Sequence, residues 1–116
     1  MYKNRSVEKV CKSLKKARKK YPSDVAEGLF GLINYLKAAP SLLDVNVMRI
    51  YNLHSLKGDR NGQLALDING RRGGYRLICV PLNEQYECSD MPKDNLVLYY
   101  KSIRIIRIEE VSNHYE

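Results

Sequence analysis

The chain has 116 residues, of which 44% are hydrophobic and 28% charged, a balance that is ordinary for a globular domain with its own core. This length predicts one domain over residues 1–116. No apolar run is long enough to span a membrane, and the stretch MYKNRSVEKV lacks the apolar segment of a signal peptide. The three cysteines are odd in number and lack C-x-x-C spacing, so we expect free thiols in a reducing cytoplasm.

The net charge of +7 comes from the first segment of the chain. Residues 1–21 contain nine Lys/Arg and one acidic residue, whereas the other 95 residues contain eleven Lys/Arg and twelve Asp/Glu. A basic stripe of this kind can contact phosphates or an acidic protein surface, although a lysine-rich helix face is often only solvated. Both interpretations stay open for three residues that we call the lysine face: Lys15, Lys16 and Lys19.

Residues 6–20 have the period of an amphipathic helix, with Ser6 as a plausible N-cap. Its apolar stripe consists of Val7, Val10, Cys11 and Leu14. The sequence YPSD then interrupts the helical pattern, and two helices joined by so short a turn should form an antiparallel hairpin.

The second helix is predicted from about Asp24 to Ala38, with Asp24 and Glu27 at capping-box spacing. Its two glycines, Gly28 and Gly31, would let the first helix pack close against it.

The second half of the chain has a different pattern. The segment SLLDVNVMRIY (41–51) is ambiguous between a helical turn and extended chain, whereas 62–68 alternates like a half-buried strand. Turn residues at 69–74 and a second strand at 75–80 complete a hairpin. The polar stretch 81–95 predicts a loop, and the β-branched and aromatic stretch 96–111 predicts one long strand or two consecutive strands. Helices followed by strands predict an α+β fold, with the helical hairpin on one face of an antiparallel sheet.

The stretch YNLHSLKGDRNGQ (51–63) concentrates His54, Lys57 and Arg60 at three-residue spacing, and Gly58 and Gly62 allow the backbone to turn there. An imidazole accepts or donates a proton near neutral pH, and fixed cations stabilise a dianionic phosphorane without a metal. The composition therefore supports metal-free phosphodiester chemistry, but only weakly. We expect the remaining charge, Asp59, to pair with Arg60 or to cap the turn.

Other classes of chemistry have little support in the sequence. The two histidines are far apart, and no cysteine or carboxylate cluster has the spacing of metal ligands. The segment GDRNG lacks the G-x-x-x-x-G-K-[ST] pattern of a phosphate loop, and there is no G-x-S-x-G nucleophile motif. We therefore expect neither a metal nor a cofactor.

The residues LHSLKGDRNGQ, followed by YRLICV, resemble the motif region of the RelE/ParE-superfamily toxins of bacterial type II toxin–antitoxin systems. The most similar branch is HigB, the plasmid-maintenance killer proteins, whose pattern L-H-x-L-K-G-D-R-x-G is long and specific. The segment VEKVCKSLKKARKKYPSDVAEGLFGLINYLKAAPSLLDV also resembles the helical hairpin of that branch, so the resemblance covers nearly the whole chain.

The resemblance implies a RelE-like fold, and an endoribonuclease that enters the ribosomal A site and cuts mRNA by attack of the 2′-hydroxyl, without metal or cofactor. It implies general-base or charge-stabilising roles for His54 and Lys57, phosphate binding by Arg76, and proton transfer by His114. Contacts to RNA or the ribosome would come from the lysine face and from Arg60, Arg71, Arg72 and Tyr115.

The expected partners are the ribosome with its mRNA and a cognate HigA-like antitoxin with a helix-turn-helix domain. The toxin alone would be monomeric in the bacterial cytoplasm, and it would form a hetero-oligomer with the antitoxin.

The C-terminal stretch IEEVSNHYE departs from the branch, which usually ends in Asp-Tyr-His. Matching the histidine places Ser112 and Asn113 where Asp and Tyr would be, whereas matching the strand places Glu110 near the Asp. We favour the first alignment, with Tyr115 as the substitute aromatic.

Two alternative functions remain. One is a ParE-like gyrase-poisoning toxin, although such toxins lack the His/Lys/His set. The other is an inactive homologue that only binds its antitoxin.

Overall fold

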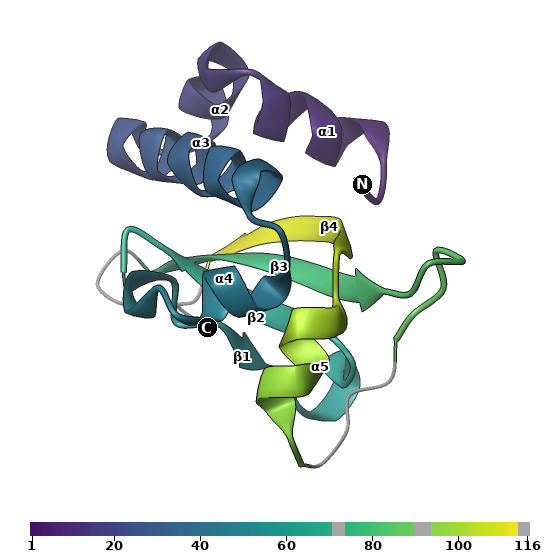
Figure 1. Ribbon diagram of the computed structural model, residues 1–116. Helices are drawn as coiled ribbons and strands as arrows, with labels where there is room; N and C mark the ends of the chain where they lie inside the picture. The colour runs from purple at the N-terminus through teal and green to yellow at the C-terminus, as the bar shows by residue number, and fades with distance from the viewer. Residues whose placement is uncertain (71–73, 90–93, 114–116) are drawn as a thin grey trace.

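The computed structural model describes residues 1–70, 74–89 and 94–113 and shows an α+β fold with a four-stranded antiparallel sheet in the order β1-β2-β3-β4 (Figure 1). The predicted α+β class and its antiparallel sheet are therefore confirmed. In chain order the elements are α1 (Arg5–Lys12), α2 (Leu14–Lys20), α3 (Ser23–Ala38), α4 (Leu42–Asn46), the 3-10 helix η1 (Arg49–Tyr51), β1 (His54–Ser55), the 3-10 helix η2 (Gly58–Arg60), β2 (Leu64–Ile68), β3 (Tyr75–Leu82), α5 (Leu96–Ser102) and β4 (Ile105–Asn113).

The predicted first helix is two helices, because the chain becomes extended at Ser13, with φ −128° and ψ 111°. The Ser13 hydroxyl accepts a hydrogen bond from the Lys16 N–H at 3.2 Å, so this serine caps a new helix instead of continuing the old one. The predicted cap at Ser6 is also wrong, because Asn4 accepts from the Val7 N–H at 2.9 Å.

The second predicted helix is confirmed as α3, which lies alongside α2 after a short turn (Figure 1). The predicted capping box is wrong, because the N-cap is Pro22 and no side chain caps the helix. Glu27 instead pairs with Arg18 at 3.2 Å, which ties α3 to α2.

The glycines of α3 do not have the role predicted for them. A Cβ on Gly28 would lie 2.9 Å from Nδ2 and 2.6 Å from Cγ of Asn69, whereas a Cβ on Gly31 would meet nothing within 4 Å. The missing side chain of Gly28 therefore makes room for Asn69, which directly follows β2, and not for the first helix. Asn69 in turn donates to the Asp24 carbonyl at 2.6 Å.

One face of the sheet carries the core. Its side chains pack against residues of α1, α3, α4 and α5, and the strand residues involved are Leu64, Leu66, Ile68, Leu77, Cys79 and Ile108. β2 is buried along its whole length, so the prediction of a half-buried strand is wrong. Ala65 and Asp67, which alternate with the core residues, are only 0% and 5% exposed because the second face is also covered by side chains.

The stretch 96–111 is the largest difference from the sequence prediction, because a helix, α5, precedes the strand β4. Tyr100 and Ile103 enter the core, whereas Leu96, Val97 and Leu98 are 41%, 56% and 59% exposed. The exposed apolar side chains of this segment gave it the sequence pattern of a strand.

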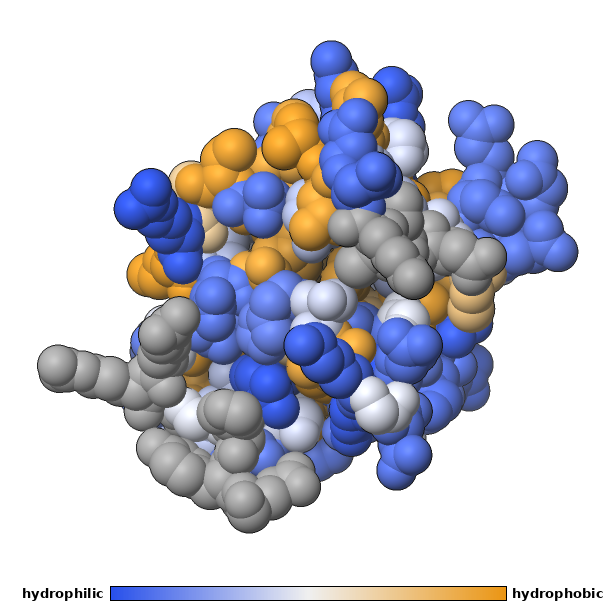
Figure 2. Space-filling view, turned by 90° about the horizontal axis from the view of Figure 1, so that it is seen from below, coloured by the Kyte–Doolittle hydropathy of each residue, from blue (hydrophilic) through white to orange (hydrophobic). Residues whose placement is uncertain are grey.

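Figure 2 shows hydrophobic residues gathered in the upper left of the face seen from below, whereas the lower half is mostly hydrophilic.

Two further segments are now defined. The ambiguous segment 41–51 forms α4 and η1, and α4 begins with a capping box in which Ser41 and Asp44 exchange hydrogen bonds. The hairpin of β2 and β3 is confirmed, with β3 extending to Leu82. Among the described residues, no helix is long and apolar enough to cross a membrane.

Candidate functional site

The second face of the sheet, directed away from the core, carries the candidate site. Alternation along the strands places Ala65, Asp67, Arg76 and Ile78 on this face, and the pairing of β3 with β4 adds Glu110 opposite Ile78. His54 joins them because it pairs with Ala65. The site is therefore assembled by strand pairing from segments that are distant in sequence.

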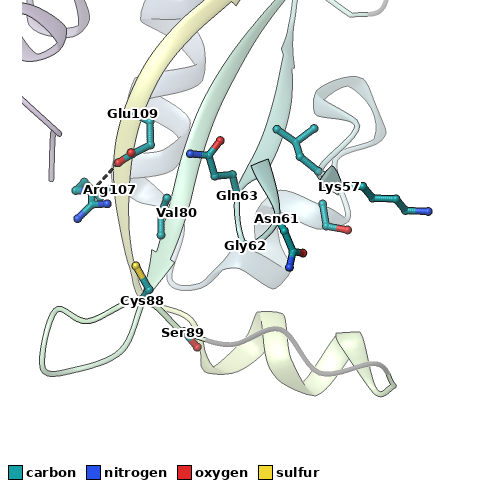
Figure 3. A pocket seen from close by; sticks show the side chains of 11 residues that line it. Lys57, Asn61, Gly62, Gln63, Val80, Cys88, Ser89, Arg107 and Glu109 are labelled. Carbon is teal, nitrogen blue, oxygen red and sulfur yellow. Dashed lines mark hydrogen bonds and ion pairs between the residues drawn. The ribbon is translucent and has the colours of Figure 1, made fainter. Parts of the chain in front are cut away.

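Two pockets open on this face. The His54 pocket, of about 340 Å³, is lined by Asn52, His54, Asp67, Gly70, Gly74, Tyr75 and Arg76. The Lys57 pocket, of about 730 Å³, has Lys57 at one end and the ion pair of Arg107 with Glu109, at 2.6 Å, at the other (Figure 3). The described residues that line the two pockets come from strands and loops, and none comes from the α-helices.

The imidazole of His54 has a defined orientation. Its Nδ1 lies 2.6 Å from the backbone carbonyl oxygen of Asn52. A carbonyl oxygen only accepts hydrogen bonds, so Nδ1 carries the hydrogen and Nε2 of the neutral ring carries the free lone pair. This is the arrangement that a general base requires.

Arg76 supplies a cation to the same pocket. It pairs with Asp67 of β2 on one side and with Ser112 of β4 on the other, so its backbone is held in the middle of the sheet. Its Nε is buried and has no hydrogen-bond partner among the described residues. A guanidinium placed this way presents fixed donors to an anion, and phosphate oxygens match its geometry.

Lys57 is exposed and lines the Lys57 pocket, so the structure places it in a different cavity from His54 and Arg76. The turns around it have the conformation predicted from the glycines, because Gly58 has φ +68° and Gly62 has φ +92°. The predicted pairing of Asp59 with Arg60 is wrong. Arg60 instead contacts Glu110 at 3.3 Å and Gln63 at 3.2 Å.

The ion pair of Arg60 with Glu110 crosses the second face between the two pockets. Across the four strands, Glu110 is in line with Ile78, Ala65 and His54, each paired with the next. The pair of Asp67 with Arg76 lies on one side of this line, and the pair of Val80 with Arg107 lies on the other. Arg60 was predicted to bind RNA; here part of its charge is already balanced by a carboxylate, which reduces what remains for a phosphate.

The lysine face lies on α2, in the helical layer on the core side of the sheet (Figure 1). All three of its lysines are exposed, and none forms an ion pair within the described residues. The structure does not bring this face together with the two pockets. The other four predicted site residues lie outside the described residues: Arg71, Arg72, His114 and Tyr115.

Other chemistries have weak support at this site. The described residues contain no group of three or more His, Cys, Asp or Glu side chains that could hold a metal ion. Burial raises the pKa of Cys79 to about 12 and that of Cys11 to about 11, which keeps both thiols protonated and poor nucleophiles.

Two site residues were missed by the sequence reasoning, Asn52 and Asp67. The only signal for Asn52 is its place before a turn, since asparagine tolerates the left-handed conformation that it has here, with φ 46° and ψ 52°. Asp67 appears in the sequence as one polar position of an alternating strand, and no pattern marks it as a pocket residue.

Comparisons with protein-family models, with curated proteins and with solved structures match this chain to none of them.

Proposed function

We propose that this protein is a HigB-like toxin, a ribosome-dependent endoribonuclease with the RelE-like arrangement of helices and sheet. The observation that carries the proposal is the His54 pocket. In it, an imidazole with a free Nε2 lone pair and the guanidinium of Arg76 line one cavity. A base and a fixed cation are the groups that metal-free cleavage of RNA needs. The motif LHSLKGDRNG, by its resemblance to the HigB branch, supports RNA as the substrate.

In the proposed reaction the 2′-hydroxyl of one nucleotide gives its proton to Nε2 of His54. The 2′-oxygen then bonds to the adjacent phosphorus, and the bond from phosphorus to the 5′-oxygen breaks. Arg76 balances the negative charge that develops on the phosphate oxygens, with Lys57 approaching from the neighbouring pocket. The leaving 5′-oxygen takes a proton from His114. The products are a 2′,3′-cyclic phosphate and a free 5′-hydroxyl.

The partners proposed for this activity are the ribosome, its mRNA and a helix-turn-helix antitoxin, in a bacterial cytoplasm. The exposed lysine face, which has no ion-pair partners within the described residues, is a suitable contact for ribosomal RNA or for an acidic antitoxin surface. Arg71, Arg72 and Tyr115 are proposed to contact RNA, on the resemblance alone.

The test compares cleavage rates of variants on programmed ribosomes. His54→Ala should slow mRNA cleavage by about 10²–10⁴-fold, and Arg76→Ala by about 10²–10³-fold. Lys57→Ala and His114→Ala should also relieve growth arrest. Lys101→Ala, an exposed substitution on α5, is the control and should cleave at the wild-type rate. Wild-type rates for both His54→Ala and Arg76→Ala would refute the proposed site.

A further inference from the structure

We propose that Asn52 and Asp67 are positioning residues for His54. Together they connect the buried strand β2 to the imidazole and hold the ring in the form with hydrogen on Nδ1. This inference rests on the proposed function only in making His54 the proton acceptor. The hydrogen bonds themselves are independent of it.

The first link is the backbone of Asn52. This residue ends η1 in the left-handed conformation, with φ 46° and ψ 52°, and its N–H donates to the Arg49 carbonyl at 3.1 Å. Left-handed backbone is unfavourable for most non-glycine residues, although asparagine tolerates it better than others. The conformation directs the Asn52 carbonyl toward Nδ1 of His54, two residues further along the chain.

The second link is the side chain of Asn52. Its Nδ2 donates to Oδ2 of Asp67 at 3.2 Å. The Asp67 side chain is 5% exposed, and its backbone lies opposite that of Arg76 in the antiparallel pairing of β2 with β3. Its carboxylate is therefore held on a rigid element. A buried carboxylate is costly without hydrogen bonds, so the amide of Asn52 also stabilises Asp67.

The two links have a consequence for the chemistry. A free neutral imidazole populates both tautomers, and only the one with hydrogen on Nδ1 leaves Nε2 able to accept a proton. His54 is half-buried and belongs to a strand of only two residues, so its own element restrains the ring little. The hydrogen-bonded chain from Asp67 through Asn52 supplies that restraint, because the hydrogen bond at one ring nitrogen sets which nitrogen of a histidine carries the hydrogen.

The test measures the tautomer and the rate separately. Asn52→Gly keeps a residue suited to left-handed backbone, and it keeps the carbonyl, but removes the amide. Asn95→Gly is the matched control, because Asn95 is also left-handed, with φ 56°, and its side chain makes no capping hydrogen bond. The tautomer is assigned from the side-chain ¹⁵N shifts of His54 in the full-length protein at pH 8, and cleavage is measured on programmed ribosomes.

We expect the wild type and Asn95→Gly to hold hydrogen on Nδ1 alone. Asn52→Gly should show a mixture of tautomers and a kcat lower by about 10–100-fold, with KM unchanged. If Asn52→Gly does not fold, the pair at Asp67 replaces it: Asp67→Asn keeps an oxygen acceptor and should retain the tautomer, whereas Asp67→Leu should lose it.

An unchanged tautomer in Asn52→Gly, or in Asp67→Leu where that replaces it, would overturn the inference. A mixed tautomer with unchanged kcat would equally overturn a role in catalysis. A wild-type protein that cuts no mRNA would refute the proposed function instead, and the ¹⁵N shifts would still decide whether Asn52 and Asp67 hold the ring.

Discussion

The two glycines of α3 give a matched pair of stability predictions. In a helix interior, alanine is more favourable than glycine by about 1 kcal/mol. Gly31→Ala should raise the free energy of unfolding by about that amount, because nothing lies within 4 Å of the added Cβ. Gly28→Ala makes the same gain, but its Cβ would lie 2.6 Å from Cγ of Asn69.

The displaced Asn69 amide would lose its hydrogen bond to the Asp24 carbonyl, which costs about 1 kcal/mol, and crowding at the contact costs about 1–3 kcal/mol more. Gly28→Ala should therefore lower the free energy of unfolding by about 1–3 kcal/mol. Urea unfolding followed by circular dichroism measures both variants. In an Asn69→Gly background the contact is absent, so Gly28→Ala should become stabilising. Equal stabilisation by both alanines in the wild-type background would refute this account of Gly28.

Four further predictions concern charge and burial. Reversing the charges of the lysine face should weaken ribosome binding and reduce the slope of log K against log salt by roughly two to three, and an unchanged slope would show a merely solvated face. In the native protein at pH 8, Cys88 should be the one thiol that reacts quickly with a disulfide reagent, because burial raises the pKa of Cys11 to about 11 and of Cys79 to about 12; equal rates for all three would contradict this. The same two shifts should lower the free energy of unfolding as pH rises above the ordinary thiol value of 9.0, since only the unfolded chain then ionises, and a flat urea midpoint between pH 9 and 11 would contradict it. Glu110→Gln should change the free energy of unfolding by less than about 1 kcal/mol, because the side chains of its ion pair are well exposed, Glu110 by 45% and Arg60 by 41%. A larger loss in urea unfolding would show that this ion pair stabilises the second face.

The sequence predicted those elements in which the local pattern and tertiary burial agree. α3 repeats its apolar residues with the helical period and buries Leu29, Leu32 and Ile33, so pattern and packing coincide. The strand prediction is wrong for the residues of α5, because the apolar and aromatic side chains of this segment do not all enter the core. Leu98 is 59% exposed while Tyr100 is buried, and only the packing of the whole chain decides which of them does so.

The candidate site was predicted in its chemistry and not in its geometry. The motif pointed to His54 and Lys57, but strand pairing brings His54 together with Arg76 in one pocket, whereas Lys57 lines another. Pairing between distant strands is not encoded in any short motif. The contact of His54 with Asn52 was equally hidden, because it uses a backbone carbonyl whose direction is set by the conformation of one residue.

The proposed function is tested most directly by incubating the purified protein with mRNA, once alone and once on programmed ribosomes, and mapping new 5′ ends. We predict a new 5′ end carrying a hydroxyl, formed only on ribosomes and absent with His54→Ala. Intact mRNA on ribosomes would contradict the proposal. If the same preparation then trapped gyrase on DNA, the gyrase-poisoning alternative would replace it, and if it bound only an antitoxin, the inactive homologue would.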